Sequence, residues 1–241
     1  ALVIWEKQWG PEHEDVAAAL NNLAEVAHAE GDWSRAEPLY ERVLAIERKV
    51  LGAAHPDVAI SLNNLAELYR KQGRETAAES FYHLALTLME TAHGADHPDL
   101  GPVLNNLAVL YKRRGLYAMA EPFYLRALHM RRLRFGEEHP AVAMSLNNAA
   151  CLYQAEGLYA SAQRLFDEAL AVAERTSGPQ TSLTGTIVGN MAVLADQQGL
   201  WNQAQLLYQR ALVIQQEQLG LHHQTVGLLV ERYAQVLDTL G

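Results

Sequence analysis

Apolar residues recur along the chain at the spacing of one face of an α-helix. In one clear run they fall at Val58, Leu62, Leu65, Ala66 and Tyr69, mostly in steps of three and four residues. Such spacing places the apolar side chains in a single stripe that a helix buries against its neighbours. The pattern predicts an amphipathic helix here, and similar runs predict helices along most of the chain.

The helical runs are copies of one another. The letters Leu-Asn-Asn-Leu-Ala begin at Leu20, Leu62 and Leu104, and a near copy, Leu-Asn-Asn-Ala-Ala, begins at Leu146, so the step is 42 residues each time. A fixed period of this length is typical of stacked copies of one supersecondary unit. The chain is therefore predicted to be a repeat array.

Each copy contains residues that start and stop helices. His55-Pro-Asp marks a helix start, because proline suits the first helical position and aspartate suits the positive end of the helix. The first helix stops at a recurring glycine such as Gly73, and the second, for example 117–135, stops before another, Gly136. One unit is predicted to be two antiparallel helices of roughly 16 to 18 residues, joined by a short turn.

The period divides the whole chain, 1–241, into one array without a linker. Full repeats are expected at 11–52, 53–94, 95–136, 137–178 and 179–220, with partial repeats at 1–10 and 221–241. Because the sequence begins and ends inside a unit, we expect it to be an excerpt of a longer protein. Repeat ends without caps expose apolar faces, which would allow self-association through them as the alternative to peptide binding.

Composition and charge narrow the class of protein. Of the 241 residues, 49% are apolar, which is ordinary for a soluble protein. The sequence contains no apolar run of about 18 residues, the length needed to cross a bilayer, and it shows no secretory signal. No membrane association is therefore expected. A single cysteine, Cys151, fits a reducing compartment, and a cytoplasmic location is expected. The formal net charge of −9 argues against binding to nucleic acid.

The repeated residues resemble a known family. Their pattern is similar to that of the tetratricopeptide repeat, whose usual period is about 34 residues. The 42-residue variant, with His-Pro-Asp-Val, Leu-Asn-Asn-Leu-Ala and Ala-Glu-Pro-Leu-Tyr at 36–40, resembles the kinesin light chain type. In the second full repeat the matching residues are Leu62, Leu65, Ala66, Tyr69, Gly73, Ala78, Tyr82 and Ala85.

The resemblance implies an all-α fold, a right-handed α-solenoid of helix-turn-helix repeats. In such a fold the first helices line a concave groove and the second helices form the outer wall. The implied function is a scaffold that binds a protein or peptide partner in the groove and is not an enzyme. The alternative is a structural or regulatory arm that associates with itself or packs on neighbouring domains of a larger signalling protein.

The first asparagine of each pair is the main candidate for peptide binding. Asparagine is a poor helix former, so its repeated use in the middle of helices gives up some stability. In the family, such groove asparagines hold the main chain of an extended peptide through their amide donors and acceptors. The competing interpretation is a bond to the next repeat, and a structural bond is favoured for the second asparagine of each pair. The candidates are Asn21, Asn63, Asn105 and Asn147.

Charged residues join the predicted peptide-binding set in the second and third full repeats. The basic ones are placed on the concave side or its edge, whereas Gln154, Asp196 and Asp238 stand at corresponding positions elsewhere. A local positive field would attract an acidic, extended peptide with an apolar anchor. The alternative is a solvated helix end, where basic residues suit the dipole. The charged members of the set are Glu67, Arg70, Lys71, Lys112 and Arg113.

The sequence carries no recognisable catalytic or metal-binding motif. The repeated histidines belong to successive units about 10 Å apart, whereas a zinc ion needs ligands within about 2 Å, so they are interpreted as helix starts. Cys151 has no histidine or lysine beside it in its own turn. Without a phosphate loop, a nucleophile elbow or paired carboxylates, we expect no catalytic residue, no metal and no cofactor.

Overall fold

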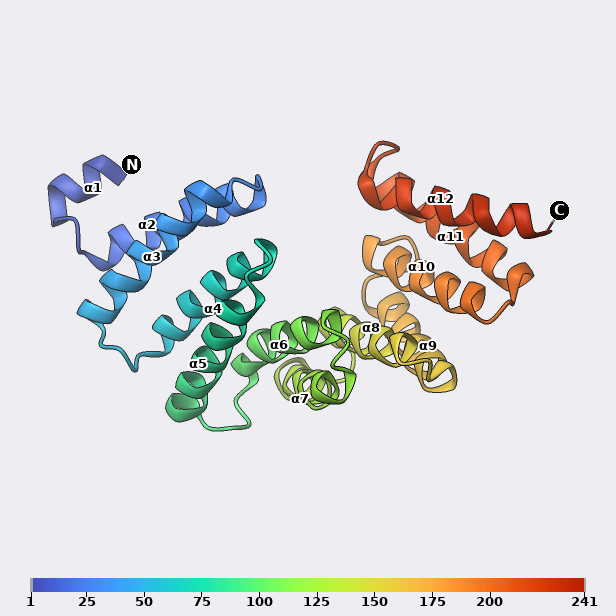
Figure 1. Ribbon diagram of the computed structural model, residues 1–241, viewed down its shortest axis with the longest axis horizontal. Coiled ribbons are helices and arrows are strands. Elements are labelled where there is room, and N and C mark those ends of the chain that lie inside the picture. The colour runs from blue at the N-terminus through green and yellow to red at the C-terminus, as the bar shows by residue number, and fades with distance from the viewer. Residues whose placement is uncertain (1, 241) are drawn as a thin grey trace. The chain divides into compact units, whose positions relative to one another are not determined.

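The computed structural model describes residues 2–240, and every regular element in that range is helical (Figure 1). The chain divides into two compact units, unit 1 from Ala1 to Leu116 and unit 2 from Tyr117 to Gly241. The prediction of an all-α fold built from helical hairpins is confirmed. The two units are described in turn.

Unit 1 contains two complete hairpins, in which α2 packs against α3 and α4 packs against α5 (Figure 1). The end of the preceding second helix, α1, lies before them, and another first helix, α6, follows them. The helices are α1 (Leu2–Trp9), α2 (Glu14–Ala29), α3 (Trp33–Val50), α4 (Pro56–Lys71), α5 (Glu75–His93), a short 3-10 helix (Pro98–Leu100) and α6 (Gly101–Arg113).

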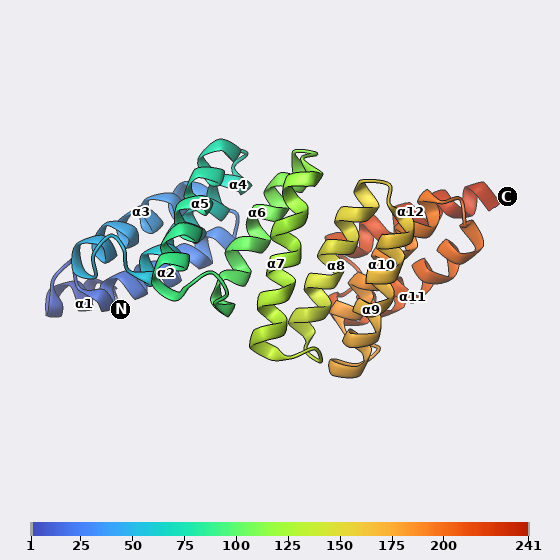
Figure 2. The same ribbon diagram turned by 90° about the horizontal axis from the view of Figure 1, so that it is seen from below.

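Unit 2 has the same construction, with hairpins formed by α8 and α9 and by α10 and α11 (Figure 2). A second helix, α7, precedes them, and a first helix, α12, packs on α11. The helices are α7 (Tyr117–Phe135), α8 (Pro140–Ala155), α9 (Tyr159–Thr176), α10 (Ser182–Gln197), α11 (Trp201–Leu219) and α12 (Gln224–Leu240).

The histidines start the first helices, as predicted. The Nδ1 atom of His55 accepts a hydrogen bond from the backbone N–H of Asp57 at 3.2 Å, and His139 accepts one from Ala141 at 3.1 Å. Such a side-chain acceptor satisfies one of the backbone donors that a helix leaves unpaired at its N-terminus. Thr181 replaces the histidine before α10 and accepts from Thr184 N–H in the same way.

Glycine ends the first helices for a conformational reason. Gly73 has a φ of 77°, which is in the left-handed region. With Gly73 in this conformation, its N–H bonds to the carbonyl of Arg70 at 3.2 Å and the N–H of Arg74 bonds to the carbonyl of Tyr69 at 2.8 Å. This pair of bonds is the Schellman motif, in which glycine avoids the steric cost that a side chain would bring.

One first helix departs from the predicted length of roughly 16 to 18 residues. In the repeat that begins at His97, a 3-10 helix covers Pro98–Leu100, and α6 then has only 13 residues, Gly101–Arg113. Pro102 stands in the first turn of α6 and has no N–H to continue the preceding helical bonds. The second proline therefore explains why the helix is broken here and continuous in the copy that begins at Pro56.

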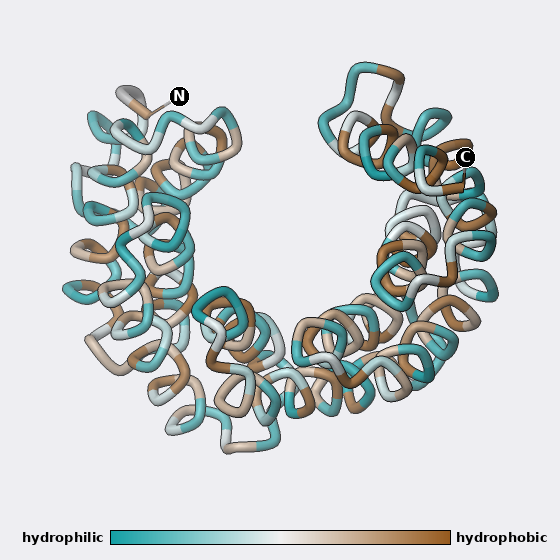
Figure 3. The backbone as a smooth tube through the Cα atoms, turned by 45° about the vertical axis from the view of Figure 1, so that its right-hand side comes forward, coloured by the Kyte–Doolittle hydropathy of each residue, from teal (hydrophilic) through white to brown (hydrophobic). Residues whose placement is uncertain are grey.

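The core of each unit is built from the repeated apolar stripe. Brown and teal positions alternate along the helices in Figure 3, as expected for helices with one buried face. Small alanines occupy the closest points of each hairpin and allow the two helices to approach within about 8 to 10 Å. Completely buried examples are Ala24, Ala36, Ala66, Ala78, Ala108, Ala120, Ala150, Ala162, Ala192 and Ala204. Ala234, at the same register in α12, is exposed because no second helix covers it among the described residues.

Candidate peptide-binding face

The asparagine pairs connect successive repeats. In unit 1 the Nδ2 of Asn64 donates to the Oδ1 of Asn21 at 3.3 Å, and the Nδ2 of Asn106 donates to the Oδ1 of Asn63 at 3.0 Å. In unit 2 Asn190 donates to Asn147 in the same way, at 2.9 Å. The second asparagine of a repeat thus makes the structural bond expected of it, and its acceptor is the first asparagine of the preceding repeat.

This bond orients the side chain of the first asparagine. Because its oxygen accepts from the next repeat, its amide nitrogen is the group left for another partner. Among the described residues, the Nδ2 atoms of Asn63 and Asn147 have no acceptor, and neither is sealed from solvent. In the first repeat the Nδ2 of Asn21 donates to Glu25 at 2.8 Å. At Asn63 and Asn147 the group left for a partner is therefore the N–H donor.

We use the term asparagine face for the side of α2, α4 and α6 in unit 1 that carries Asn21, Asn63 and Asn105. The other predicted residues of unit 1 lie one or two turns further along α4 and α6, at 67–71 and 112–113. Asn147 lies in unit 2, on α8, and is nearly buried. Eight of the nine predicted residues therefore belong to one unit.

Glu67 and Arg70 form an ion pair inside unit 1. The Nε of Arg70 donates to Glu67 Oε2 at 2.8 Å, a second guanidinium nitrogen donates to Oε1, and the hydroxyl of Tyr82 donates to Oε2 at 2.7 Å. Burial raises the pKa of Glu67, but the hydrogen bonds from Arg70 and Tyr82 outweigh it and leave this pKa below its ordinary value. Only 8% of Arg70 is exposed. Its charge is neutralised within the protein.

His28 lies close enough to Glu67, Arg70 and Lys71 for their charges to act on it, although the sequence analysis did not include it among the site residues. It stands 42 residues before Arg70, at the same register in α2, and this spacing could have found it. Burial lowers the pKa of His28, the carboxylate of Glu67 raises it, and Lys71 and Arg70 lower it again, so the net shift is downward. The neutral imidazole is therefore favoured near neutral pH, and His28 adds no full charge to the face.

Two lysines remain as the available cations of the predicted set. Arg113 lies 3.9 Å from Glu75, a long ion pair. No acidic group lies within ion-pair distance of Lys71 or Lys112 among residues 2–240. Lys71 is exposed and Lys112 is half-buried. The free positive charge of the asparagine face therefore comes from these lysines more than from the arginines.

Neither a metal-ligand cluster nor a membrane-spanning helix is found among the described residues. Within residues 2–240, no three His, Cys, Asp or Glu side chains gather in a way that could hold a metal ion. In the same range, none of the helices has both the length and the apolar character needed to span a bilayer. The arrangement suits hydrogen bonding and ion pairing with a polar partner.

The repeats match a known family along most of the chain. The model of the tetratricopeptide repeat family matches overlapping windows at residues 1–49, 15–91, 57–132, 101–175 and 142–217. Repeats of this family generally mediate protein–protein interactions and serve as non-catalytic scaffolds. No curated protein matches the sequence.

Solved structures show the same hairpin packing. The crystal structure of BtubC (BKLC) from P. vanneervenii is 25% identical, with a TM-score of 0.75 over 89% of this chain and 85% of that chain. A putative kinesin light chain from Podosopora anserina with nearly identical TPR-like repeats is 23% identical, with a TM-score of 0.71 over 85% and 97%. The apo form of RapI is 14% identical, with a TM-score of 0.69 over 83% and 70%. The predicted similarity to kinesin light chain-like repeats is confirmed.

Proposed function

The chain belongs to the tetratricopeptide repeat family, and from this premise we propose that unit 1 binds an extended, acidic peptide segment on the asparagine face. The observation that carries the proposal is the orientation of the asparagines. The oxygens of Asn21 and Asn63 accept bonds from the next repeat, and the Nδ2 of Asn63 then has N–H donors that suit the carbonyl oxygens of an extended main chain. The overlapping family windows, which together span residues 1–217, also support a single array of repeats over that range.

The acidic character of the partner follows from the charges that remain. Arg70 is neutralised by Glu67, and Arg113 lies near Glu75, whereas Lys71 and Lys112 have no acidic partner in the part of the chain that the structure describes. An acidic segment can pair with these lysines without displacing an existing ion pair. Surface pairs of this kind are individually weak, so their main effect is to orient the peptide and to speed its association. Affinity has to come from the main-chain hydrogen bonds and from apolar contacts.

Fluorescence anisotropy tests the proposal directly. The probe is a fluorescein-labelled peptide of alternating glutamate and alanine around a central leucine, and its control replaces every glutamate by glutamine. The glutamate peptide is expected to bind more tightly at low salt, and the difference should shrink as the Debye length falls from about 30 Å at 0.01 M to about 8 Å at 0.15 M. Equal binding of the two peptides at low salt would refute the acidic preference.

Two sets of variants assign the contacts. Lys71→Gln and Lys112→Gln should each reduce binding and its salt dependence, whereas Lys7→Gln on α1 removes one positive charge outside the predicted set and is the matched control for each single change. Asn63→Ala removes one main-chain donor and should weaken binding about fivefold, because such a bond contributes about 1 kcal/mol. Its control is Asn202→Ala at the exposed start of α11 in unit 2. Unchanged affinity in the asparagine variant would show that the amide is structural only.

Self-association is the second candidate function, because one helix exposes an apolar face. In α12, Val230 is 47% exposed and Leu237 is 41% exposed, whereas Val188 and Ala195 at the same positions of α10 are buried. A second copy of this chain could cover that face. Light scattering across a range of concentrations decides the question: a mass that rises with concentration and returns to that of a monomer in Leu237→Glu supports it, and a constant monomer mass excludes it.

A further inference from the structure

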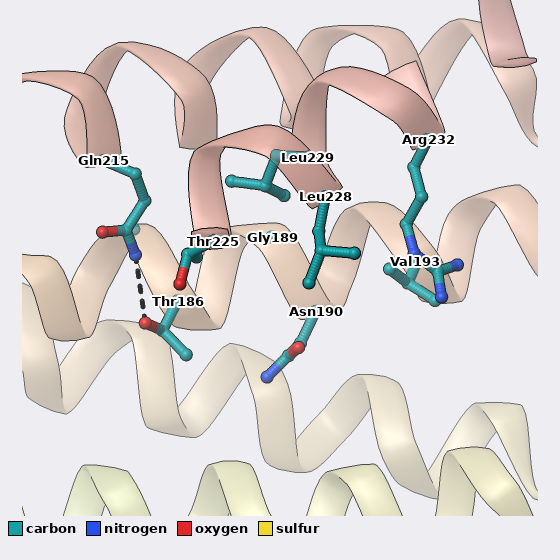
Figure 4. A pocket seen from close by; sticks show the side chains of 10 residues that line it. Thr186, Gly189, Asn190, Val193, Gln215, Thr225, Leu228, Leu229 and Arg232 are labelled. Carbon is teal, nitrogen blue, oxygen red and sulfur yellow. Dashed lines mark hydrogen bonds between the residues drawn. The ribbon is translucent and has the colours of Figure 1, made fainter. Parts of the chain in front are cut away.

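A cavity opens in unit 2 where the row of first asparagines is interrupted (Figure 4). The repeat places Gly189 of α10 at the position that Asn147 occupies in α8. The cavity beside this glycine has a volume of about 270 Å³ and lies among α10, α11 and α12. The residues that matter for its chemistry are Gly189, Asn190, Val193, Leu228, Leu229 and Arg232.

The glycine is required for the cavity to exist in this form. Gly189 is buried, and a Cβ atom built on it would lie 3.2 Å from Cδ2 of Leu229 and 3.8 Å from Cβ of Ala211. Any larger side chain, including the asparagine of the other repeats, would fill the space or push α12 away. Where the other repeats have an asparagine side chain, this repeat therefore has a glycine and a cavity beside it.

One end of the cavity is closed by a buried polar side chain. The Nε2 of Gln215 donates to the carbonyl of Ser182 and to Oγ1 of Thr186, both at 3.1 Å, and the latter bond is drawn in Figure 4. Gln215 is completely buried and its donors are satisfied within the protein. Gln215 therefore has no N–H left for a ligand, and the groups available to one are those around Leu228 and Arg232.

The open side combines apolar walls with the guanidinium of Arg232, whose neighbour within the protein is the hydroxyl of Tyr208, a group without charge at neutral pH. Leu228 is 53% exposed, and Val193 and Leu229 continue the apolar surface inward. Arg232 and Val193 both line this side of the cavity, and their side chains overlap in the view of Figure 4. Among the described residues, no carboxylate comes within ion-pair distance of Arg232. The acidic residue nearest to the cavity lining in the sequence of α10 is Asp196, about one turn after Val193. A carboxylate from outside could therefore bind Arg232.

A neighbouring amide provides a hydrogen-bond acceptor. Asn190 donates its Nδ2 to Asn147 at 2.9 Å, which leaves its own Oδ1 without a donor in the described part of the chain. An amide oxygen in this state can accept the main-chain N–H of a peptide. The apolar wall, the cation and the acceptor are the three groups needed to hold one residue of a peptide and the carboxylate next to it.

We infer that this cavity binds a peptide segment in which an apolar side chain stands next to a carboxylate. Sites for small molecules and cofactors have volumes of about 300 to 1,000 Å³, so a cavity of about 270 Å³ suits a single side chain better than a cofactor. Leucine fills the apolar space, the carboxylate pairs with Arg232, and Asn190 accepts the main-chain N–H. The carboxylate can belong to an acidic side chain or to the C-terminus of the partner.

This site is separate from the asparagine face. It lies wholly within unit 2 and uses none of the residues proposed to bind peptide in unit 1. A failure of one proposal therefore leaves the other untouched, and the two can be read from different resonances in one spectrum.

The test is an NMR titration of the full 15N-labelled chain with blocked dipeptides. N-acetyl-leucyl-glutamate amide is expected to shift the backbone resonances of Gly189, Val193 and Arg232. N-acetyl-leucyl-glutamine amide should bind about tenfold more weakly because the charge-assisted bond is lost, and N-acetyl-alanyl-glutamate amide about tenfold more weakly because less apolar surface is buried. N-acetyl-leucine with a free carboxylate distinguishes a C-terminal carboxylate from a side-chain one, according to which probe binds more tightly.

Variants of the protein test the assignment from the other side. Arg232→Gln should weaken binding of the glutamate probe about tenfold and remove its advantage over the glutamine probe. Arg164→Gln, which changes an exposed side chain on α9, should leave the affinity for both probes unchanged. Gly189→Asn should place an amide side chain in the cavity and abolish the localised shifts. Absence of localised shifts at about 10 mM probe, a concentration well above the Kd expected for such a fragment, would overturn the inference. Equal affinity for the glutamate and glutamine probes would overturn it as well.

Discussion

The ion pair between Glu67 and Arg70 provides a test of whether Arg70 is a structural residue or part of the binding charge. The side chains are 24% and 10% exposed, and Tyr82 also donates to the carboxylate. Glu67→Gln keeps the shape and removes the charge. Arg70→Met keeps much of the apolar stem and removes the guanidinium. The double variant removes both partners and replaces the pair with groups that need no counter-charge.

The expected magnitude follows from burial. Removing one partner of a buried ion pair typically costs about 3 to 5 kcal/mol, because the other charge is left without compensation. The side chain of Glu67 is about a quarter exposed, which reduces the cost of either change, and in Glu67→Gln the amide keeps an acceptor oxygen for Arg70. We therefore expect either single change to lower the free energy of unfolding by about 2 to 3 kcal/mol. The double variant should cost less than the sum of the single changes by at least about 1 kcal/mol.

Native-state hydrogen exchange of the amides in α4 and α5 measures these effects where they arise. Repeat proteins are stabilised by each unit and its neighbours, so a local readout is more informative than a single melting temperature. Arg42→Met is the control, because its pair with Glu6 is 39% and 28% exposed and should contribute less than about 1 kcal/mol. Additive effects of the Glu67 and Arg70 changes, within about 0.5 kcal/mol, would refute the reasoning.

The same pair predicts a pH dependence. The pKa of Glu67 is lower in the folded protein than its ordinary value of 4.5, so the folded state binds this proton less well than the unfolded state. The stabilisation is therefore fully present above the ordinary value and is lost as the pH falls through the lowered one. As the pH is lowered, the hydrogen-exchange protection of the amides in α4 should decline more steeply in the native chain than in Glu67→Gln. Parallel acid profiles would contradict the assignment.

Two further changes test the packing and the helix starts. Ala120→Phe places an aromatic ring at a completely buried position between helices and should lower the free energy of unfolding by about 1 to 3 kcal/mol, measured by urea denaturation, whereas Ala118→Phe at an exposed position of the same helix should have little effect. His139→Ala removes the acceptor for Ala141 N–H and should cost about 1 kcal/mol, measured by thermal unfolding, and His139→Asn should restore most of the loss because asparagine also caps helices. No recovery in the asparagine variant would indicate that stacking of His139 on Phe135, at 4.1 Å between ring centres, is the stronger contribution.

The sequence predicted the hairpins because their signals are local. Periodic apolar residues, a cap such as His55 and a glycine such as Gly73 each act within a few residues, and the 42-residue step repeats them. The shortened α6 was missed although its cause is equally local, since Pro102 stands where the other copies have residues with a backbone N–H. That departure could have been found by comparing the copies residue by residue.

The candidate site was predictable by position and less so by role. The register placed Asn63 and Lys112 correctly on first helices, but it could not tell that Arg70 would be held by Glu67 and Tyr82. That distinction depends on side-chain geometry between α4 and α5, and the apolar and charged patterns of the sequence are compatible with either outcome. The peptide-binding role of the nine residues stays a prediction.

The register of the repeat explains how one fold can carry different recognition chemistry. Asn63 and Gly189 occupy the same position in two different repeats. Asn63 has an amide side chain that is oriented by a hydrogen bond from the next repeat, whereas Gly189 leaves a cavity that Leu229 of the next repeat lines. Both outcomes use the same contact between successive first helices, so the backbone does not need to change. What the position offers to a partner is therefore decided by one side chain and its neighbour in the following repeat. Gly189→Asn should convert the second chemistry into the first: the cavity is lost, and binding of an apolar side chain is lost with it. If Gly189→Asn kept its affinity for N-acetyl-leucyl-glutamate amide, that would show that the cavity does not depend on this position.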